Sequence, residues 1–102
     1  MELVALVKHD CPVCDQMLPV LDAAGVRIVS QSSAADTADQ AQRLGLSCVP
    51  ELDAELELSA RLDPAAVPAV FLLDDGAERD RVEGIQPFRG LFGIAVFPPS
   101  RD

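Results

Sequence analysis

The 102-residue sequence contains no tryptophan or tyrosine, few basic residues and only three cysteines. Its 8 Lys and Arg stand against 17 Asp and Glu, and the formal net charge is −9. This balance argues against nucleic acid as a partner, because Lys and Arg supply most of the affinity for phosphates. It argues equally against an anionic membrane surface. No stretch reaches the roughly 18 apolar residues of a membrane span, and three cysteines are too few for a disulfide scaffold.

The remaining composition is typical of a folded domain, with 49% hydrophobic and 25% charged residues. The length predicts one domain over residues 1–102, either alone or as a module of a longer protein. The N-terminus has an acidic second residue and no basic n-region, so it does not look like a signal peptide. We therefore expect a cytoplasmic location.

The hydrophobic pattern predicts an α/β fold. Apolar runs at residues 3–7 and 26–29 predict strands, and helical spacing predicts helices from residue 13 to Gly25 and over Ala34–Leu44. This order predicts parallel strand pairing. Pro19 lies inside the first helix and predicts a kink or break there. The other expected elements are an extended segment at 46–52, a helix at 54–62, whose spacing also fits a strand, strands at 66–73 and 78–84, and a short helix near 87–93.

One motif carries clear chemistry: Cys11-Pro12-Val13-Cys14 follows a predicted strand and opens a predicted helix. The thiolate is the reactive form of cysteine. The free N–H groups and the positive dipole end of the helix would stabilise negative charge on Cys11. The sulfur of Cys14 lies within reach and can resolve a mixed disulfide. We predict Cys11 as the attacking thiolate and Cys14 as the resolving thiol, with Pro12 in the first helical turn.

Other interpretations of the cysteine pair stay open. Structural zinc takes four ligands, and Cys48 and His9 could complete a Cys3His site. A thiol pair could also capture a soft ion such as Cu(I), Zn(II) or Hg(II), or the chain could be a redox-inactive docking domain. Outside such roles, Cys48 is expected to be a buried apolar residue and His9 a surface or loop residue.

The cysteine motif, together with the sequence AVPAVFLLDDG at residues 66–76, resembles thioredoxin-fold proteins. More narrowly, VPELD at 49–53 followed by LDPAAVP at 62–68 is similar to the TlpA-like and peroxiredoxin-related branch, in which an extra helix and strand precede a cis-proline. The resemblance covers roughly residues 1–85. It implies a thioredoxin-like α/β fold, with a central mixed sheet and helices on both faces.

The resemblance also implies residue roles and a function. Pro68 takes the place of the cis-proline that faces the cysteines, and a competing alignment gives this role to Pro50. Val67 would pair through its backbone with the partner's extended chain, and Pro12 would also contact substrate. The implied activity is thiol–disulfide exchange without a bound cofactor or metal. Its partners would be a protein or small-molecule thiol or disulfide and an upstream reductase or oxidant.

Two features depart from the family pattern. Asp10 stands where the family usually has tryptophan before the first cysteine. The tail after residue 85 is short and interrupted by glycine and proline, where the family has a long amphipathic helix. The four phenylalanines are expected to pack in or beside the core, and the alternative is an exposed docking patch in the tail: Phe71, Phe88, Phe92 and Phe97.

Overall fold

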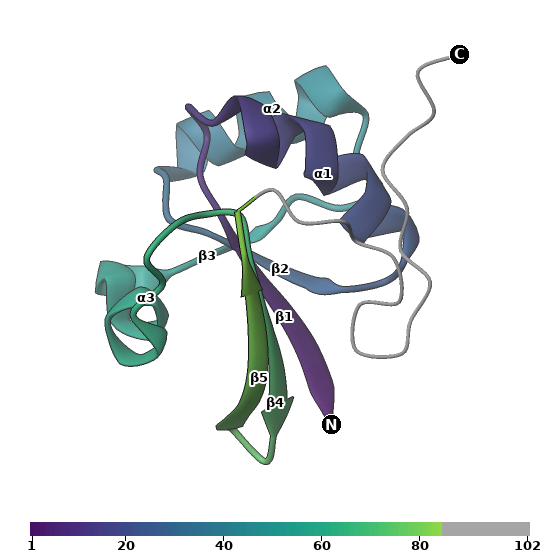
Figure 1. Cartoon of the computed structure of the whole chain (residues 1–102). Helices are drawn as coiled ribbons and strands as arrows, with labels where there is room; N and C mark the ends of the chain where they lie inside the picture. The colour runs from purple at the N-terminus through teal and green to yellow at the C-terminus, as the bar shows by residue number, and fades with distance from the viewer. Residues whose placement is uncertain (85–102) are drawn as a thin grey trace.

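The computed structural model describes residues 1–84, which form a five-stranded sheet flanked by helices (Figure 1). The regular elements, in chain order, are β1 (Glu2–Val7), α1 (Pro12–Ala23), β2 (Arg27–Ser30), α2 (Ala34–Leu44), β3 (Glu51–Leu52), a 3-10 turn (Ala54–Leu56), α3 (Glu57–Leu62), β4 (Ala69–Asp74) and β5 (Ala77–Glu83). The helix expected near 87–93 and the phenylalanines of the tail lie outside the described residues. No helix among residues 1–84 is long and apolar enough to cross a membrane.

The sheet has the strand order β3-β2-β1-β4-β5. Strands β1, β2 and β3 run parallel, as the alternation of strands and helices predicts. Strand β4 pairs antiparallel with β1, and β5 pairs antiparallel with β4. The sheet is therefore mixed, as expected. Because β1 is the central strand, the segment that follows it and carries Cys11 leaves from the middle of the sheet.

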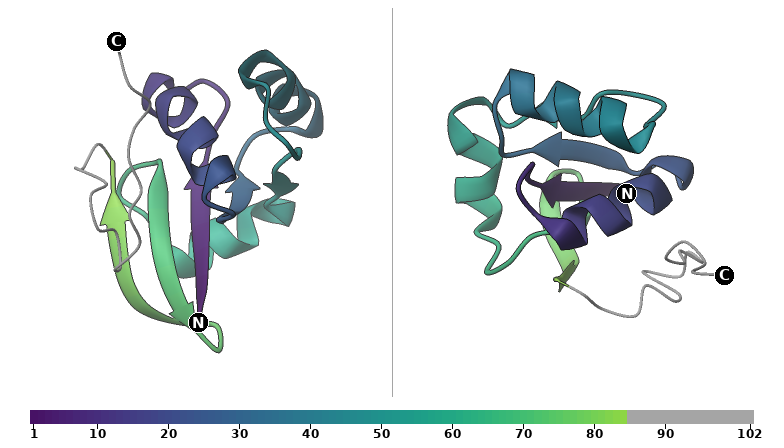
Figure 2. Two further views of the ribbon diagram at one scale, coloured as in Figure 1. Left: turned by 90° about the vertical axis from the view of Figure 1, so that its right-hand side faces the viewer. Right: turned by 90° about the horizontal axis from the view of Figure 1, so that it is seen from above.

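The core is divided between the two faces of the sheet. Helix α1 covers one face and α3 lies on the opposite face (Figure 2). Helix α2 lies beside α1, and its Leu44 packs against the core under α1. The buried residues under α1 include the sheet residues Ala5, Val7, Ile28 and Val70 and the helix residues Met17, Leu18 and Leu21. Those on the α3 side are Val4, Leu6, Val29, Leu62, Ala69, Phe71 and Leu73.

Helix α1 continues through Pro19 to Ala23, so of the kink or break predicted at this proline the break is wrong. A proline inside a helix removes one N–H donor. The burial of Met17, Leu18 and Leu21 against the sheet outweighs this local loss. The helix ends as predicted near Gly25, whose φ of 74° would strain any residue with a side chain.

The helix predicted at 54–62 is divided in two. Residues Ala54–Leu56 form a 3-10 turn, and α3 begins only at Glu57. Glu55 and Leu56 both have φ of 55°, in the left-handed region. A regular helix cannot pass through two such residues, and neither residue type signals this conformation in a sequence.

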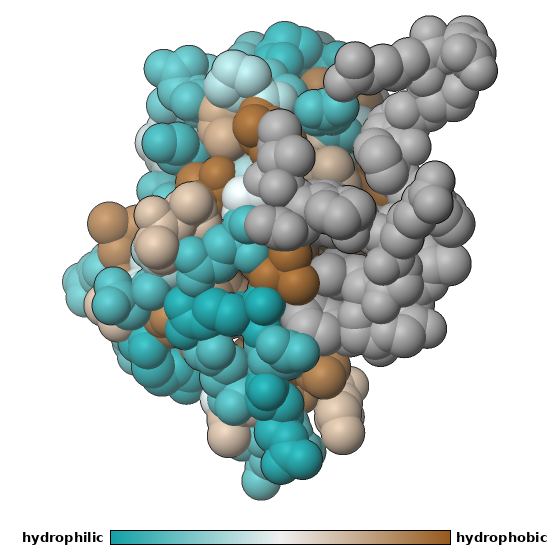
Figure 3. All heavy atoms as spheres, in the orientation of Figure 1, coloured by the Kyte–Doolittle hydropathy of each residue, from teal (hydrophilic) through white to brown (hydrophobic). Residues whose placement is uncertain are grey.

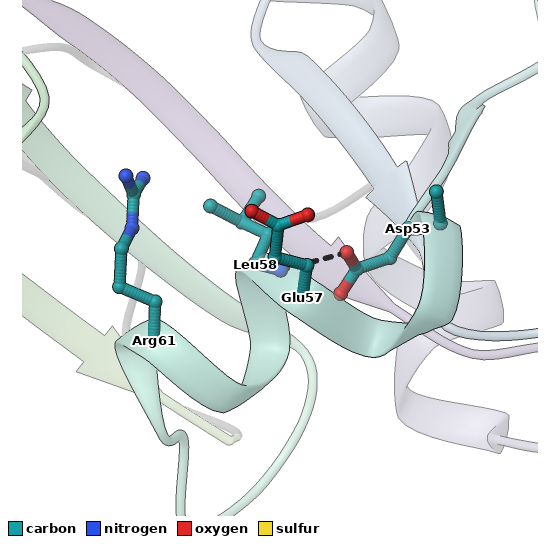
Figure 4. A pocket seen from close by; sticks show the side chains of 5 residues that line it. Asp53, Glu57, Leu58 and Arg61 are labelled. Atoms are coloured by element: carbon teal, nitrogen blue, oxygen red, sulfur yellow. Dashed lines mark hydrogen bonds between the residues drawn. The ribbon is translucent and has the colours of Figure 1, made fainter.

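Asp53 sets the start of α3. Its carboxylate accepts hydrogen bonds from the backbone N–H groups of Leu58 (2.9 Å) and Ser59 (2.8 Å), and the Leu58 bond is drawn in Figure 4. The Ser59 hydroxyl also donates to it. Partial burial opposes the charge of Asp53, but these hydrogen bonds outweigh burial and lower its pKa. Asp53 thus satisfies helix N–H groups that would otherwise lack partners.

Strand β5 is an edge strand with a charged outer surface. Hydrophilic residues dominate the part of the molecule where β5 faces the viewer in Figure 3, and such charges discourage pairing with another chain. Arg81 of β5 lies over the ring of Phe71, with 4.9 Å from guanidinium carbon to ring centroid. It also donates to the carbonyl of Leu62 at the end of α3 (2.7 Å) and pairs with Glu78 and Glu83. Arg81 therefore connects α3 to the sheet.

Candidate active site

Cys11 is the N-cap residue of α1. Its backbone is extended (φ −145°, ψ 104°), and its Sγ accepts a hydrogen bond from the backbone N–H of Cys14 at 3.2 Å. Pro12 occupies the first helical turn, as predicted, where its missing N–H costs nothing. Both cysteines are free thiols. The cap geometry directs an N–H group and the positive end of the helix dipole at the Cys11 sulfur, which favours negative charge there.

The two sulfurs differ in their surroundings. Cys11 keeps 8% of its surface exposed, whereas Cys14 is fully buried. Burial is the largest cause that raises the pKa of the Cys14 thiol to about 12; the hydrogen bond and negative charge of Cys11 also raise it, and Lys8 acts in the opposite direction. Cys14 is therefore protonated at neutral pH. The arrangement fits the predicted division between an attacking Cys11 and a resolving Cys14.

The segment before β4 closes the other side of Cys11. The Val67–Pro68 peptide bond is cis, as the resemblance implies. It is the only cis peptide bond among residues 1–84. The bond before Pro50 is therefore trans, and the competing assignment of the cis-proline role to Pro50 is wrong. The Sγ of Cys11 lies 3.8 Å from the carbonyl oxygen of Val67, within contact distance for a sulfur donor. Pro68 is buried and Val67 half-buried, so Val67 is the member of this pair that a substrate can reach.

A hollow of about 350 Å³ opens beside Cys11. Helix α1 and the segment before it supply one wall, and α2 supplies the other. The lining residues are His9, Asp10, Cys11, Pro12, Asp15, Asp39 and Arg43. Three carboxylates therefore face one guanidinium and one imidazole beside the Cys11 sulfur.

No protein-family model and no curated protein matches this sequence. Solved structures with similar architecture do exist. StoA from Bacillus subtilis aligns with a TM-score of 0.69 at 19% identity, over 83% of this chain and 74% of StoA. A secreted Mycobacterium tuberculosis disulfide oxidoreductase homologous to E. coli DsbE aligns with a TM-score of 0.63 at 19% identity, over 82% of this chain and 69% of that one. M. tuberculosis DsbF gives a TM-score of 0.65 at 18% identity, over 83% and 70%.

This chain has a thioredoxin-like fold. The fold class expected from the sequence is confirmed, including helices on both faces. The strand and helix expected ahead of the cis-proline are present as β3 and α3.

In this thioredoxin-like fold, α2 contributes a set of polar contacts to the hollow that the sequence did not reveal. Arg43 donates to both carboxylate oxygens of Asp15, at 2.9 and 3.2 Å. His9 pairs with Asp39 at 3.1 Å, so this loop histidine is part of the site's rim. Partial burial opposes the charge of Asp15, but hydrogen bonds from Arg43 and Gln40 outweigh it and lower the pKa of that carboxyl.

The third cysteine lies elsewhere. Cys48 is exposed, so the expectation that it is buried is wrong. It lines a separate hollow with Asp22 and Gly25, near the end of α1 opposite to Cys11. The loop that carries it packs by polar contact, since Ser47 donates twice to the Asp22 carboxylate, instead of by burying the thiol. Cys48 therefore cannot complete a Cys3His site, and within residues 1–84 no three His, Cys, Asp or Glu residues are grouped to hold a metal ion.

Proposed function

We propose that this chain is a thiol–disulfide oxidoreductase of the TlpA-like kind. One observation carries the proposal: the sulfur of Cys11 sits at the N-terminus of α1, hydrogen-bonded by the N–H of Cys14 and next to the Val67 carbonyl. The helix N-terminus and the N–H of Cys14 favour negative charge on this sulfur, a second thiol lies in reach, and the Val67 segment lies beside it for an extended substrate. One protein of similar fold is itself described as a disulfide oxidoreductase.

In the proposed reaction the Cys11 thiolate attacks one sulfur of a substrate disulfide. The substrate S–S bond breaks, its second sulfur leaves as a thiolate that takes up a proton, and a mixed disulfide joins Cys11 to the substrate. Cys14 then loses its proton, attacks the Sγ of Cys11 and releases the remaining substrate sulfur as a thiol. The two cysteines supply both electrons and end as a disulfide, which a thiol reductant restores. The same steps in reverse oxidise a substrate dithiol.

The environment of Cys14 suits its part in this sequence. Burial raises its pKa, and Cys11 adds to the effect through its hydrogen bond and its negative charge. Formation of the mixed disulfide removes that negative charge. The pKa of Cys14 is therefore expected to fall at the step where Cys14 must lose its proton and attack. Before that step, Cys14 stays protonated and does not compete with Cys11 for substrate.

A redox titration tests the proposal. The protein is equilibrated in glutathione buffers of graded potential, its thiols are trapped by alkylation, and the labels on each cysteine are counted by mass spectrometry. We expect Cys11 and Cys14 to switch together in one two-electron step, with about 30 mV for each tenfold change in equilibrium, while Cys48 titrates separately. A pair that never oxidises, or that an ion protects from the label, would contradict the proposal.

The charge around Cys11 predicts which substrates react fastest. The hollow holds more carboxylates than cationic groups, and the chain as a whole carries a net charge of −9. We expect the reduced protein to react with cystamine, a cationic disulfide, about tenfold faster than with anionic oxidised glutathione at low ionic strength. Each rate is divided by that of free dithiothreitol with the same disulfide. The preference should shrink as salt screens the charges.

A pair of substitutions separates the hollow from the overall charge. Asp10→Asn removes a carboxylate from the hollow, and Asp75→Asn removes the same charge from the turn between β4 and β5. We expect only Asp10→Asn to reduce the preference for cystamine substantially. Equal effects of the two variants would show that the preference comes from the net charge of the chain and not from the hollow. Equal normalised rates of the native chain with the two disulfides would show that there is no preference.

A further inference from the structure

Gln40 is a fully buried polar residue in the middle of α2. Its side-chain Nε2 donates to the backbone carbonyl of Lys8 at 3.0 Å and to a carboxylate oxygen of Asp15 at 2.9 Å. A longer contact of 3.4 Å reaches the carbonyl of His9. A single amide group thus faces three oxygen acceptors, all within four residues of Cys11 in the sequence.

These acceptors lie on both sides of Cys11. Lys8 and His9 belong to the segment that leads from β1 to Cys11, whereas Asp15 lies in the first turn of α1. The N–H of Asp15 in turn donates to the carbonyl of Cys11 at 3.0 Å. Gln40 therefore connects α2 both to the backbone that leads into Cys11 and to the side chain of Asp15 in the helical turn that follows it.

The site uses only the donor half of the amide. The Oε1 of Gln40 is buried and accepts no hydrogen bond from residues 1–84. An unpaired buried oxygen is costly, and turning the amide over would place Oε1 against three other oxygens, so the orientation is set by the neighbours. The chain tolerates this cost at a position where an apolar side chain would fill the same space. The hydrogen bonds that the Nε2 group donates beside Cys11 offset the cost of the unpaired oxygen.

We propose that Gln40 is a positioning residue for Cys11. It holds the Cys11 sulfur within reach of the N–H of Cys14 and beside the Val67 carbonyl. The inference rests on the proposed thiol–disulfide exchange. It makes a chemical prediction, because the position requires donors and no acceptor. A lysine ammonium has three donors and no acceptor, so it matches the three oxygens and leaves none unpaired, whereas methionine supplies no donor.

The test is the single-turnover oxidation of the reduced full chain by cystamine, quenched with acid and measured by mass spectrometry. For Gln40→Met we expect the maximal rate to fall about tenfold, as small misplacements of a reacting group do, with the half-saturating concentration changed less than about twofold. Gln40→Lys, which keeps donors at this position, should react at a rate within about threefold of that of the native chain. Gln31→Met is the matched control, since it also removes a glutamine donor, but one that bonds Ser59 on the α3 side.

The outcomes separate the two proposals. A native chain that does not react with cystamine overturns the proposed function and the inference with it. A native chain that reacts, with a folded Gln40→Met that reacts equally fast, overturns the inference alone. If circular dichroism shows Gln40→Met to be unfolded, Gln40→Asn replaces it, because this amide is too short to reach the same acceptors. A slow Asn variant beside a fast Lys variant then supports the inference, and equal rates for the two overturn it.

Discussion

Replacing Cys11 by serine is expected to lower the rate of disulfide reduction by three orders of magnitude or more, roughly to the background rate. A serine hydroxyl is not ionised near neutral pH and cannot form a disulfide, so both the attack and the storage of two electrons are lost. Cys14→Ser should behave differently. Its Cys11 still attacks, but no second sulfur releases the substrate, so a mixed disulfide on Cys11 accumulates. Reaction with cystamine, followed by mass spectrometry of the intact protein, shows both effects.

Cys48→Ser is the control for these two variants. Cys48 is exposed and lies at the far end of α1, so its loss should leave the exchange rate within about twofold of native, as is usual for surface substitutions away from a site. Full activity in Cys11→Ser would show that another thiol is the nucleophile. Trapping of substrate on Cys11→Ser but not on Cys14→Ser would reverse the roles assigned to the pair.

The sequence was sufficient to predict the parts of this site that depend on local pattern. Cys11 and Cys14 stand in a strand–turn–helix context, and the spacing of three residues places both at the start of one helix whatever the rest of the chain does. Pro68 was assigned through the family resemblance, because a strong strand and a tight turn follow it. Each prediction rests on residues close together in the sequence.

The contacts from α2 could not be predicted in this way. Gln40 and Arg43 are separated from Asp15 by 25 and 28 positions, and they meet it only because α2 packs beside α1 at one particular angle. A sequence shows that Ala34–Leu44 is an amphipathic helix but not how that helix is rotated against its neighbour. The single weak signal was a long polar side chain among the otherwise small buried residues of α2, Thr37 and Ala41.

The exposure of Cys48 and the start of α3 show a second limit. Free cysteines are usually buried, but this general tendency does not include the contacts of Ser47 with Asp22, which hold the loop so that its thiol faces outward. The beginning of α3 depends on the left-handed conformation of Glu55 and Leu56. Asp53 carried the one readable signal, since aspartate often caps helices, but it reaches N–H groups five and six residues ahead, beyond the usual spacing.

Phe71→Ala is expected to lower the free energy of unfolding by about 3–5 kcal/mol, the usual cost of emptying a fully buried aromatic site. Phe71 lies in the centre of β4 with none of its surface exposed, and it packs against Val4 and Leu6 of β1. Its ring also supports the guanidinium of Arg81, which in turn holds the end of α3. The substitution therefore removes core packing and weakens the link between α3 and the sheet.

Small domains have only about 5–15 kcal/mol of stability in total, so this one change removes a large part of it. Urea unfolding followed by far-ultraviolet circular dichroism measures the loss, because a chain without tryptophan or tyrosine gives little fluorescence signal. Leu56→Ala is the matched control: this leucine is 48% exposed, and its loss should change the stability by no more than about 0.5 kcal/mol. If Phe71→Ala were as mild as Leu56→Ala, the core on the α3 side would not be packed around Phe71. Conversely, if Arg81→Met reproduced about a third of the Phe71→Ala loss, the link from ring to guanidinium to α3 would be established as part of that core.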